Sequence, residues 1–196
     1  MLKSKDDVIQ LIQSDDTMME IIQAASTLNL PDWWICAGFV RSKIWDELHG
    51  FNDRTLTPDV DVIYFDSVNI DENDEKLLEK QLRRILPNVP WSVKNQARMH
   101  VVNRIPPYTS CEDAISKFPE TATALGVKLD SENNLVLTAP CGIEDVLHLE
   151  VKPTPFFTET KERVVIYENR IIKKNWKKIW HKINVHHTTV SKPHFK

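Results

Sequence analysis

Two aspartates separated by one residue, Asp59 and Asp61, are the strongest chemical signal in the sequence. They open the segment 59–66, whose alternating residues are typical of a strand with one buried face. Side chains at i and i+2 of a strand project from one face, so the two carboxylates repel each other unless a cation lies between them. Magnesium is commonly held by one or two carboxylates plus substrate phosphates. The pair therefore predicts a Mg²⁺ (or Mn²⁺) site, and the alternative is a pair that only lines a solvated strand edge.

A turn that could receive a phosphate precedes the aspartates. The apolar run 33–37 has the composition of a strand, Gly38 follows it at once, and a helical pattern starts near Val40. Backbone N–H groups at such a turn and at a helix N-terminus can hold a phosphate. Arg41, in the first turn of the helix, offers a fixed cation to the same phosphate. A phosphate cradle followed by a metal-binding pair is what nucleotidyl transfer requires.

Hydrophobic patterning predicts the elements that position these residues. In chain order it indicates two amphipathic helices within 8–25, a strand at 33–37, a helix at 40–48, a strand at 59–66, a helix at 71–86, and a strand at 91–95 that could continue through 99–102. Further on it indicates helices at 110–118 and 119–125, strands at 127–129, 135–138 and 146–151, and a helix within 164–183. This order predicts an α/β or α+β layout around a small sheet.

Length and composition set the class of protein. The chain has 196 residues, of which 41% are hydrophobic and 27% are charged, as in an ordinary globular protein. Its formal net charge of -3 gives no overall attraction to nucleic acid or to an anionic membrane. The N-terminus is charged, no apolar run is long enough to span a bilayer, and the three cysteines form no CxxC pair. We therefore expect a cytoplasmic protein that does not bind a membrane.

Two basic segments leave alternatives open. The run from Lys94 to His100 is either a solvated strand face or a second contact for phosphate or acceptor, made by Arg98 and His100. The stretch 170–182 interleaves lysines with Trp176 and Trp180. It fits a packed helix with a solvated basic side, and it also fits a surface that binds a nucleic-acid strand by phosphate contacts and stacking.

Longer motifs carry a family resemblance. The segment 37–41 followed by the Asp59–Asp61 pair resembles the head domain of CCA-adding enzymes and poly(A) polymerases, whose pattern is a glycine pair, x-Val-Arg-Asp, then Asp-x-Asp on a strand. The segments AGFVRSKIWDELHG, PDVDVIYFD, WSVKNQARMH, PETATALGVKL and APCGIEDVL resemble a family of bacterial nucleotidyltransferase-like proteins of unknown function, over roughly residues 20–185. This resemblance implies an α+β polymerase-β-type nucleotidyltransferase fold, with a small mixed sheet flanked by helices and a C-terminal α+β extension.

The resemblance also implies roles for individual residues. Asp59 and Asp61 would be catalytic and bind the metal, and Gly38, Phe39 and Arg41 would bind the nucleotide. We expect one domain over residues 1–196, with a core at about 20–105, a C-terminal lobe at about 106–185 and a disordered tail at 186–196.

The sequence departs from the family pattern at several positions. Phe39 replaces the second glycine or serine of the turn, and Ser42 replaces the aspartate after the arginine. Polymerase-β-type enzymes also carry a third carboxylate on a neighbouring strand, where this chain offers Asn95. The possible substitutes are Asp66, Asp145 and Glu150.

The predicted function is magnesium-dependent transfer of a nucleoside monophosphate from a nucleoside triphosphate to a hydroxyl acceptor. The acceptor could be a small molecule, a protein or RNA. The chain lacks a recognisable spiral of helical domains behind the head, so we do not expect CCA addition itself. The alternative is a catalytically silent nucleotide- or RNA-binding protein that uses the same cleft, which Phe39 and the missing third acid favour.

Overall fold

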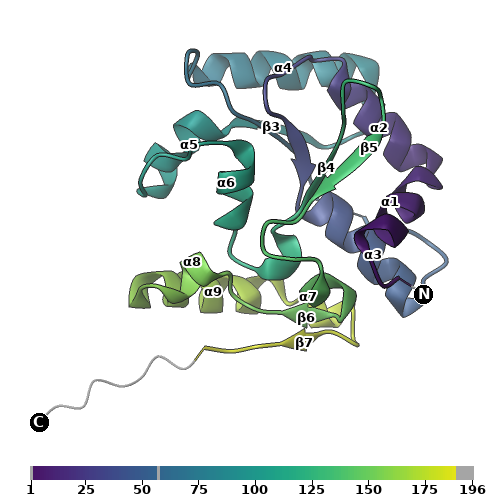
Figure 1. Cartoon of the computed structure of the whole chain (residues 1–196), viewed down its shortest axis with the longest axis vertical. Coiled ribbons are helices and arrows are strands. Elements are labelled where there is room, and N and C mark those ends of the chain that lie inside the picture. Colours follow the sequence, from purple (N-terminus) through teal and green to yellow (C-terminus); the bar gives the residue numbers. More distant parts are fainter. Residues whose placement is uncertain (1, 57, 189–196) are drawn as a thin grey trace, which may run out of the picture.

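A five-stranded sheet in the order β3-β2-β1-β4-β5 forms the centre of the computed structural model, which describes residues 2–56 and 58–188 (Figure 1). Its strands are β1 (Trp34–Cys36), β2 (Val60–Tyr64), β3 (Trp91–Asn95), β4 (Gly126–Leu129) and β5 (Leu135–Thr138). β2 and β3 are parallel, and the other neighbours are antiparallel. A separate parallel pair consists of β6 (Glu150–Val151) and β7 (Asn184–Val185). The predicted α+β class with a small mixed sheet is confirmed.

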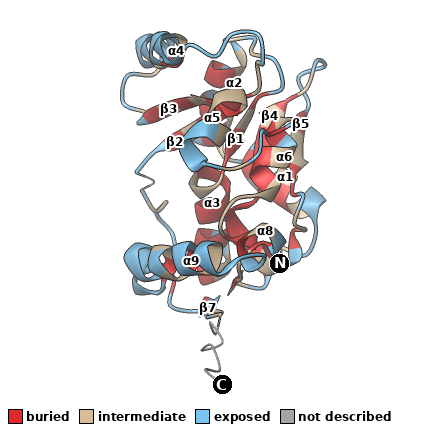
Figure 2. Cartoon of the chain, turned by 90° about the vertical axis from the view of Figure 1, so that its left-hand side faces the viewer, coloured by how far each residue is buried: buried red, intermediate tan, exposed pale blue. Residues whose placement is uncertain are grey.

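Helices flank this sheet. The helices are α1 (Lys5–Gln13), α2 (Asp16–Ser26), α3 (Gly38–His49), α4 (Glu72–Ile85), α5 (Gln96–Asn103), α6 (Cys111–Ser116), α7 (Glu144–Leu147), α8 (Pro155–Thr158) and α9 (Lys161–Lys174), with 3-10 turns η1 (Thr121–Thr123) and η2 (Trp176–Lys178). α1 packs against β5, α2 against β4 and α4 against β3, while α3 contacts both β1 and β2. Figure 2 shows buried residues in the strands and in the inward sides of α2 and α3.

The two faces of the sheet are covered unequally. Ile35 and Val62 lie on one face and are fully buried in the main core. Cys36 and Ile63 lie on the other face, in a smaller cluster with α6. Because side chains alternate along a strand, Asp61 shares this second face. Smaller apolar cover on this face leaves room for a polar cavity beside Asp61.

The end of the described chain folds back onto α3. The ring of Trp45 meets those of Trp176 and Trp180 edge-on, with centroids 5.9 and 5.2 Å away. The indole N–H of Trp180 donates to a carboxylate oxygen of Asp46 at 2.8 Å. These contacts hold α9 and η2 next to the N-terminus of α3.

Several predicted helix ends are confirmed by their caps. The Ser110 side chain accepts a hydrogen bond from the backbone N–H of Asp113 and starts α6. Asp15 and Asp71 cap α2 and α4 in the same manner. Gly50, with a φ of 71°, ends α3 in the left-handed conformation that glycine adopts without strain.

The strand predicted to continue through 99–102 is wrong, because the chain turns into α5 directly after β3. Asn95 causes this change: its side-chain oxygen accepts from the backbone N–H of Ala97 at 3.0 Å and caps the helix. Its amide also donates to the carbonyl oxygens of Asp66 and Asn69, both at 2.8 Å. Asn95 is therefore a structural residue that connects the loop after β2 to the start of α5.

Two predictions in the C-terminal half are wrong in part. The strand expected at 146–151 is split, since α7 runs to Leu147 and only β6 is extended. The helix expected within 164–183 stops at Lys174, where Asn175 takes a φ of 42° and turns the chain. After this turn the chain forms η2 and β7.

The sequence suggested a boundary near residue 105 between a core and a C-terminal lobe. The central sheet contains strands from both sides of this boundary, because β4 and β5 belong to the sheet. The start of the predicted tail is tied down: the backbone N–H of Thr188 donates to Glu168 at 2.6 Å. Residues 189–196 lie outside the described part of the chain. Among the helices that the structure describes, none is long and apolar enough to cross a membrane.

One buried carboxylate joins α4, β3 and α5. Glu75 is fully buried and accepts from the backbone N–H of Asn95 at 3.0 Å and from two guanidinium nitrogens of Arg98 at 3.1 and 2.8 Å. Lys94 lies 3.3 Å from the same carboxylate. Burial acts to raise the pKa of Glu75, but the hydrogen bonds from Arg98 and Asn95 outweigh burial and lower the pKa.

We expect Glu75→Ala to lower the free energy of unfolding by about 3 kcal/mol, because it leaves Arg98 and a backbone N–H without their partner. Urea unfolding measures this loss. The exposed neighbour variant Lys76→Ala is the control, and it should change stability by less than about 0.5 kcal/mol. Since the folded pKa of Glu75 is depressed, its stabilisation is present above the unfolded value and lost as pH falls through the folded value. Equal stability of both variants would contradict this role.

Candidate active site

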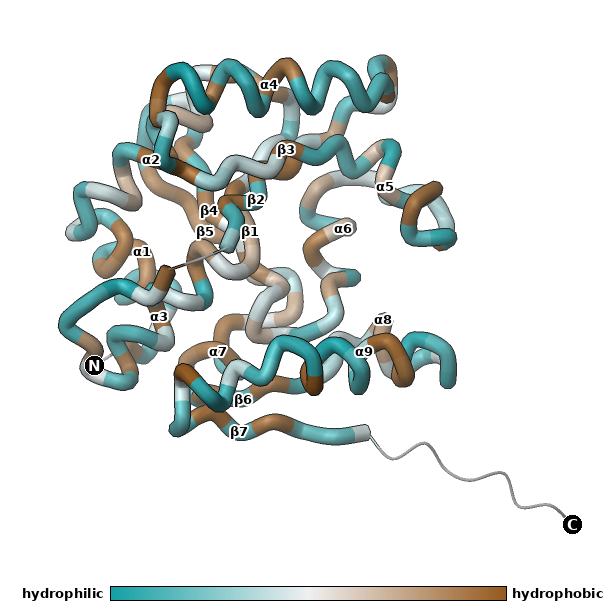
Figure 3. The backbone as a smooth tube through the Cα atoms, turned by 180° about the vertical axis from the view of Figure 1, so that it is seen from behind, coloured by the Kyte–Doolittle hydropathy of each residue, from teal (hydrophilic) through white to brown (hydrophobic). Residues whose placement is uncertain are grey.

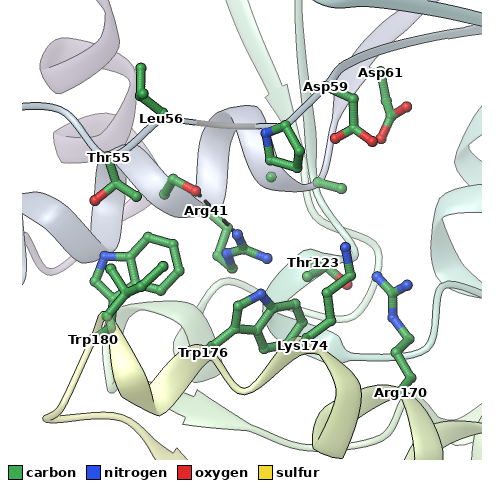
Figure 4. A pocket seen from close by; sticks show the side chains of 15 residues that line it. Arg41, Thr55, Leu56, Asp59, Asp61, Thr123, Arg170, Lys174, Trp176 and Trp180 are labelled. Atoms are coloured by element: carbon green, nitrogen blue, oxygen red, sulfur yellow. Dashed lines mark hydrogen bonds between the residues drawn. The ribbon is translucent and has the colours of Figure 1, made fainter.

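A cavity of about 290 Å³ lies between the start of α3, the segment before β2, and α9 (Figure 4). Its wall includes Ala37, Gly38, Arg41, Ser42, Thr55, Leu56, Pro58, Asp59, Asp61, Thr123, Arg170, Lys174, Trp176, Ile179 and Trp180. Four of the predicted site residues therefore line one cavity: Gly38, Arg41, Asp59 and Asp61.

The two aspartates lie next to each other on the upper side of this cavity. Asp59 directly precedes β2 and Asp61 is its second residue, and Figure 4 shows their carboxylates side by side. Burial, then the charge of Asp59, raises the pKa of Asp61, so the ionised pair is unfavourable as it stands. Two adjacent oxygen ligands with unbalanced negative charge suit a hard divalent cation. Within residues 2–56 and 58–188, no group of three or more His, Cys, Asp or Glu side chains could hold a metal, so further ligands would come from water or substrate.

The residue beside Asp61 on the neighbouring strand is a serine. In the parallel register of β2 and β3, Asp61 pairs with Ser92, and the Ser92 hydroxyl acts to lower the pKa of Asp61 against the rise caused by burial. Sequence reasoning missed Ser92, because only the register identifies it. A third carboxylate expected at such a position is replaced here by a hydroxyl.

Asn95, which the sequence offered in the place of the third acid, and the three possible substitutes all serve other contacts. Asp66 accepts from the backbone N–H of Val68, and Asn95 caps α5. Asp145 pairs with Lys152, and Glu150 pairs with His186. None of the four lines the cavity among the described residues. Sequence spacing alone could not have excluded them, since each lies within or after a predicted strand.

The turn before α3 is strained at Ala37. This residue has φ 53° and ψ -115°, outside the regions that an alanine ordinarily adopts, and α3 starts directly after it, two residues earlier than predicted. Gly38 itself does not need a glycine conformation, and an added Cβ would meet only Arg41, at 3.8 Å. Because the first N–H groups of a helix lack intrahelical partners, this turn offers donors at the cavity.

Phe39 points away from the cavity. Its side chain is 1% exposed and lies in the main core, with the Arg54 guanidinium 5.2 Å from its ring. Only the backbone of Phe39 is available to a ligand at the turn. The bulky side chain at the family's glycine position is thus accommodated because it packs in the core.

Arg41 is held between three tryptophan rings. Its guanidinium carbon lies 5.0, 4.5 and 5.1 Å from the ring centres of Trp45, Trp176 and Trp180. One terminal nitrogen donates to Ser42 at 3.1 Å, whereas the buried Nε has no hydrogen-bond partner in the described part of the chain. Burial lowers the pKa of Arg41 to about 10, so the side chain stays charged at neutral pH. A desolvated cation with an unused donor favours an anion beside it.

Two cations of α9 face the aspartates across the cavity. Figure 4 shows Arg170 and Lys174 rising from α9 toward Asp59 and Asp61. Both positive charges act to lower the pKa of Asp61. Glu120, which is fully buried, fixes Arg170 through an ion pair of 2.6 Å. The sequence analysis left open whether this basic stretch is the solvated side of a packed helix or a nucleic-acid surface. The i, i+4 spacing of Arg170 and Lys174 was the signal that both lie on one helix face.

The other polar cluster does not line this cavity. Arg98 is occupied by Glu75, and the segment from Lys94 to His100 changes from strand to helix within the run. Arg98 therefore does not line the cavity that holds the aspartates. The alternative in which Arg98 contacts phosphate there gains no support from the structure.

The comparisons with known proteins agree with this architecture. A family model described as "Nucleotidyltransferase" matches residues 23–185. No curated protein matches the sequence. A solved structure described as revealing a CCA-adding enzyme head domain superposes with a TM-score of 0.86, is 37% identical, and covers 96% of this chain and 98% of its own.

More distant structures share the fold alone. A CCA-adding enzyme in complex with CTP has a TM-score of 0.58 and 11% identity, and the match covers 94% of this chain but 44% of that enzyme. The Thermotoga maritima CCA-adding enzyme complexed with tRNA has a TM-score of 0.56 and 14% identity, with 95% of this chain and 43% of that enzyme covered. The resemblance predicted from the motifs is confirmed by the family-model match and by the head-domain structure. The chain belongs to this nucleotidyltransferase family.

Proposed function

We propose that the protein transfers a nucleoside monophosphate from a nucleoside triphosphate to a hydroxyl acceptor, with Mg²⁺ or Mn²⁺ bound by Asp59 and Asp61. One observation carries the proposal: two carboxylates, one just before β2 and one within it, and two cations of α9 face each other across a single cavity that also contains a helix N-terminus. Negative ligands for a metal and positive ligands for phosphates are what a metal-bound triphosphate needs.

The metal would be held by the two aspartates and by phosphate oxygens. When bound, a divalent cation neutralises charge on the transferring phosphoryl group. In its absence, burial and then the charge of Asp59 raise the pKa of Asp61, so both disfavour the ionised pair. The side chains therefore supply a site whose electrostatic cost falls when a cation enters.

The triphosphate would lie along the opposite wall. The backbone N–H groups of Gly38 and Phe39 would donate to its phosphates, and Arg41 would add the unused Nε donor. Lys174 and Arg170 would hold the remaining phosphate charge from α9. CCA-adding enzymes that share the fold are known in complexes with CTP and with ATP, which supports a nucleoside triphosphate as the donor.

A second candidate function follows from Ser92. If chemistry requires a third carboxylate, a hydroxyl beside Asp61 leaves a protein that binds a nucleotide without transferring it. The two functions differ in one outcome. Both need triphosphate binding, but only the first transfers the nucleoside monophosphate to an acceptor.

The aspartate pair can be tested through stability. Because burial and Asp59 raise the folded pKa of Asp61, its charged form disfavours folding at neutral pH, and the penalty disappears as pH falls through the folded value toward the unfolded one. We expect Asp61→Asn to melt at a higher temperature than the unsubstituted protein at neutral pH and to lose this advantage in acid. Added Mn²⁺ should stabilise the unsubstituted protein and the control below, but not Asp61→Asn. Asp53→Asn, an exposed aspartate outside the cavity, is the matched control.

The chemistry can be tested with nucleoside triphosphates labelled at the α-phosphate, Mg²⁺ or Mn²⁺, and a cell extract as the source of acceptor. We expect the double variant Asp59→Asn, Asp61→Asn to lower transfer by at least about 100-fold, since metal stabilisation of the transition state is worth several kcal/mol. Asp53→Asn should transfer normally. Equal transfer by the double variant would remove the aspartates from the mechanism, and triphosphate binding without any transfer would favour the silent binding protein.

The arginine site predicts an effect on affinity. Arg41→Lys should weaken triphosphate binding by about tenfold, because a lysine cannot present the guanidinium donors between the tryptophan rings. Isothermal titration calorimetry measures this change, and thermal unfolding checks that the variant is folded. Arg84→Lys on the exposed side of α4 is the control. Unchanged affinity in Arg41→Lys would exclude Arg41 from the phosphate site.

A further inference from the structure

A second, larger cavity of about 590 Å³ begins where the first one ends. Asp61 and Arg170 line both cavities, so the two meet at the aspartate that would bind the metal. The second cavity continues from Ile63 of β2 between α5 and the segment after α6 on one side and α8 and α9 on the other. Figure 1, and Figure 3 from behind, show α5 and α6 facing α8 and α9 on one side of the sheet.

The wall of this cavity is mainly apolar and aromatic. The residues that give it this character are Ile63, Met99, Ile105, Tyr108, Phe118, Pro119, Phe156, Phe157 and Ile166. The Tyr108 hydroxyl, which accepts from Asn103 at 3.1 Å, adds a polar group. Polar and charged side chains, among them Asn103 and Thr160, interrupt this apolar surface, and a cavity of this size with aromatic walls can hold one small molecule.

The cations around this cavity are largely neutralised by carboxylates. Lys94 lies 3.3 Å from Glu75 and Lys117 lies 2.6 Å from Asp113.

A third pair repeats this pattern, since Arg163 pairs with Glu159. Arg170 is shared with the cavity of the aspartates, where the proposed function uses its charge. Arg104 adds an exposed cation, and Glu162 adds an acid. Binding of a nucleic-acid strand depends on several cations that contact its phosphates. Paired cations around an apolar cavity therefore favour a compact acceptor of low charge over an RNA end.

We infer that this second cavity is the acceptor site, and that the acceptor is a small molecule with a hydroxyl group on an aromatic or apolar body. The inference rests on the proposed nucleotidyl transfer and names its acceptor. The acceptor's hydroxyl oxygen forms a bond to the α-phosphorus next to Asp61. The bond from that phosphorus to the bridging oxygen breaks, pyrophosphate leaves with the electron pair, and the hydroxyl proton passes to water.

Two matched substitutions on α9 test this assignment. Ile166 lines the second cavity and is 53% exposed, whereas Ile172 is 67% exposed and lines neither this cavity nor that of the aspartates. Ile166→Trp should fill the acceptor cavity from its open side, and Ile172→Trp should add the same side chain elsewhere. Partial exposure of both residues makes unfolding of either variant unexpected, and thermal unfolding checks this.

The probe is naphthalenemethanol, an aromatic alcohol, followed by NMR chemical shifts, and a single-stranded RNA oligonucleotide is the competitor. We expect saturable binding of naphthalenemethanol to the unsubstituted protein both with and without bound triphosphate and Mn²⁺. Ile166→Trp should weaken that binding by at least about tenfold, whereas Ile172→Trp should leave it unchanged. Triphosphate affinity should be equal in all three proteins.

Each other result is decisive. No saturable binding of the alcohol, equal binding by Ile166→Trp, or displacement of the alcohol by triphosphate would overturn the acceptor cavity. Tight binding of the RNA that Ile166→Trp abolishes would show a nucleic-acid acceptor in its place. Failure of the triphosphate to bind any of the proteins would instead overturn the proposed function, and with it the acceptor role.

Discussion

The packing of the C-terminal tryptophans on α3 is the contact on which the site depends. Trp176 and Trp180 meet Trp45 edge-on and enclose the guanidinium of Arg41. Because η2 follows α9 after one residue, this contact also fixes the position of α9 and of Arg170 relative to the sheet. In the proposed function the aspartates would hold the cation, and the tryptophan contact would add the positive wall for the triphosphate.

Charge in the cavity is divided between a central strand and a helix at its rim. The aspartates lie at the start of the strand, with β1 on one side and β3 on the other. The facing cations come from a helix that is held by side-chain contacts, among them the buried pair of Arg170 with Glu120. In the proposed function the strand would position the metal ligands and the long side chains of the helix would contact the phosphates. This arrangement suits the two roles, because metal geometry tolerates less displacement than contacts by long side chains.

Much of the fold was predictable from local patterns. The strands at 33–37 and 59–66, the caps of α2, α4 and α6, and the glycine end of α3 follow from alternation and capping rules that act within a few residues. The predicted site residues that line one cavity were accessible for the same reason, since a strand, a turn and a helix start are local features.

The remaining features depend on contacts between distant segments. Asn95 ends a strand because it hydrogen-bonds to loops near Asp66 and Asn69, which alternation within 91–102 does not reveal. Ser92 gains its position from the parallel register of two strands. Trp180 reaches α3 after the helix ends at Lys174, where Asn175 turns the chain, whereas the pattern predicted a helix within 164–183.

The distance in sequence between Asp46 and Trp180, which hydrogen-bond 134 positions apart, affects how the site is made. During synthesis the aspartates leave the ribosome long before the tryptophans, so a nascent chain carries the carboxylates without the opposing cations. Assembly of the cavity must wait for a late, non-local contact, which slows the last stage of folding. Until that contact forms, the growing chain has the two carboxylates without the enclosed cavity that surrounds them in the complete fold.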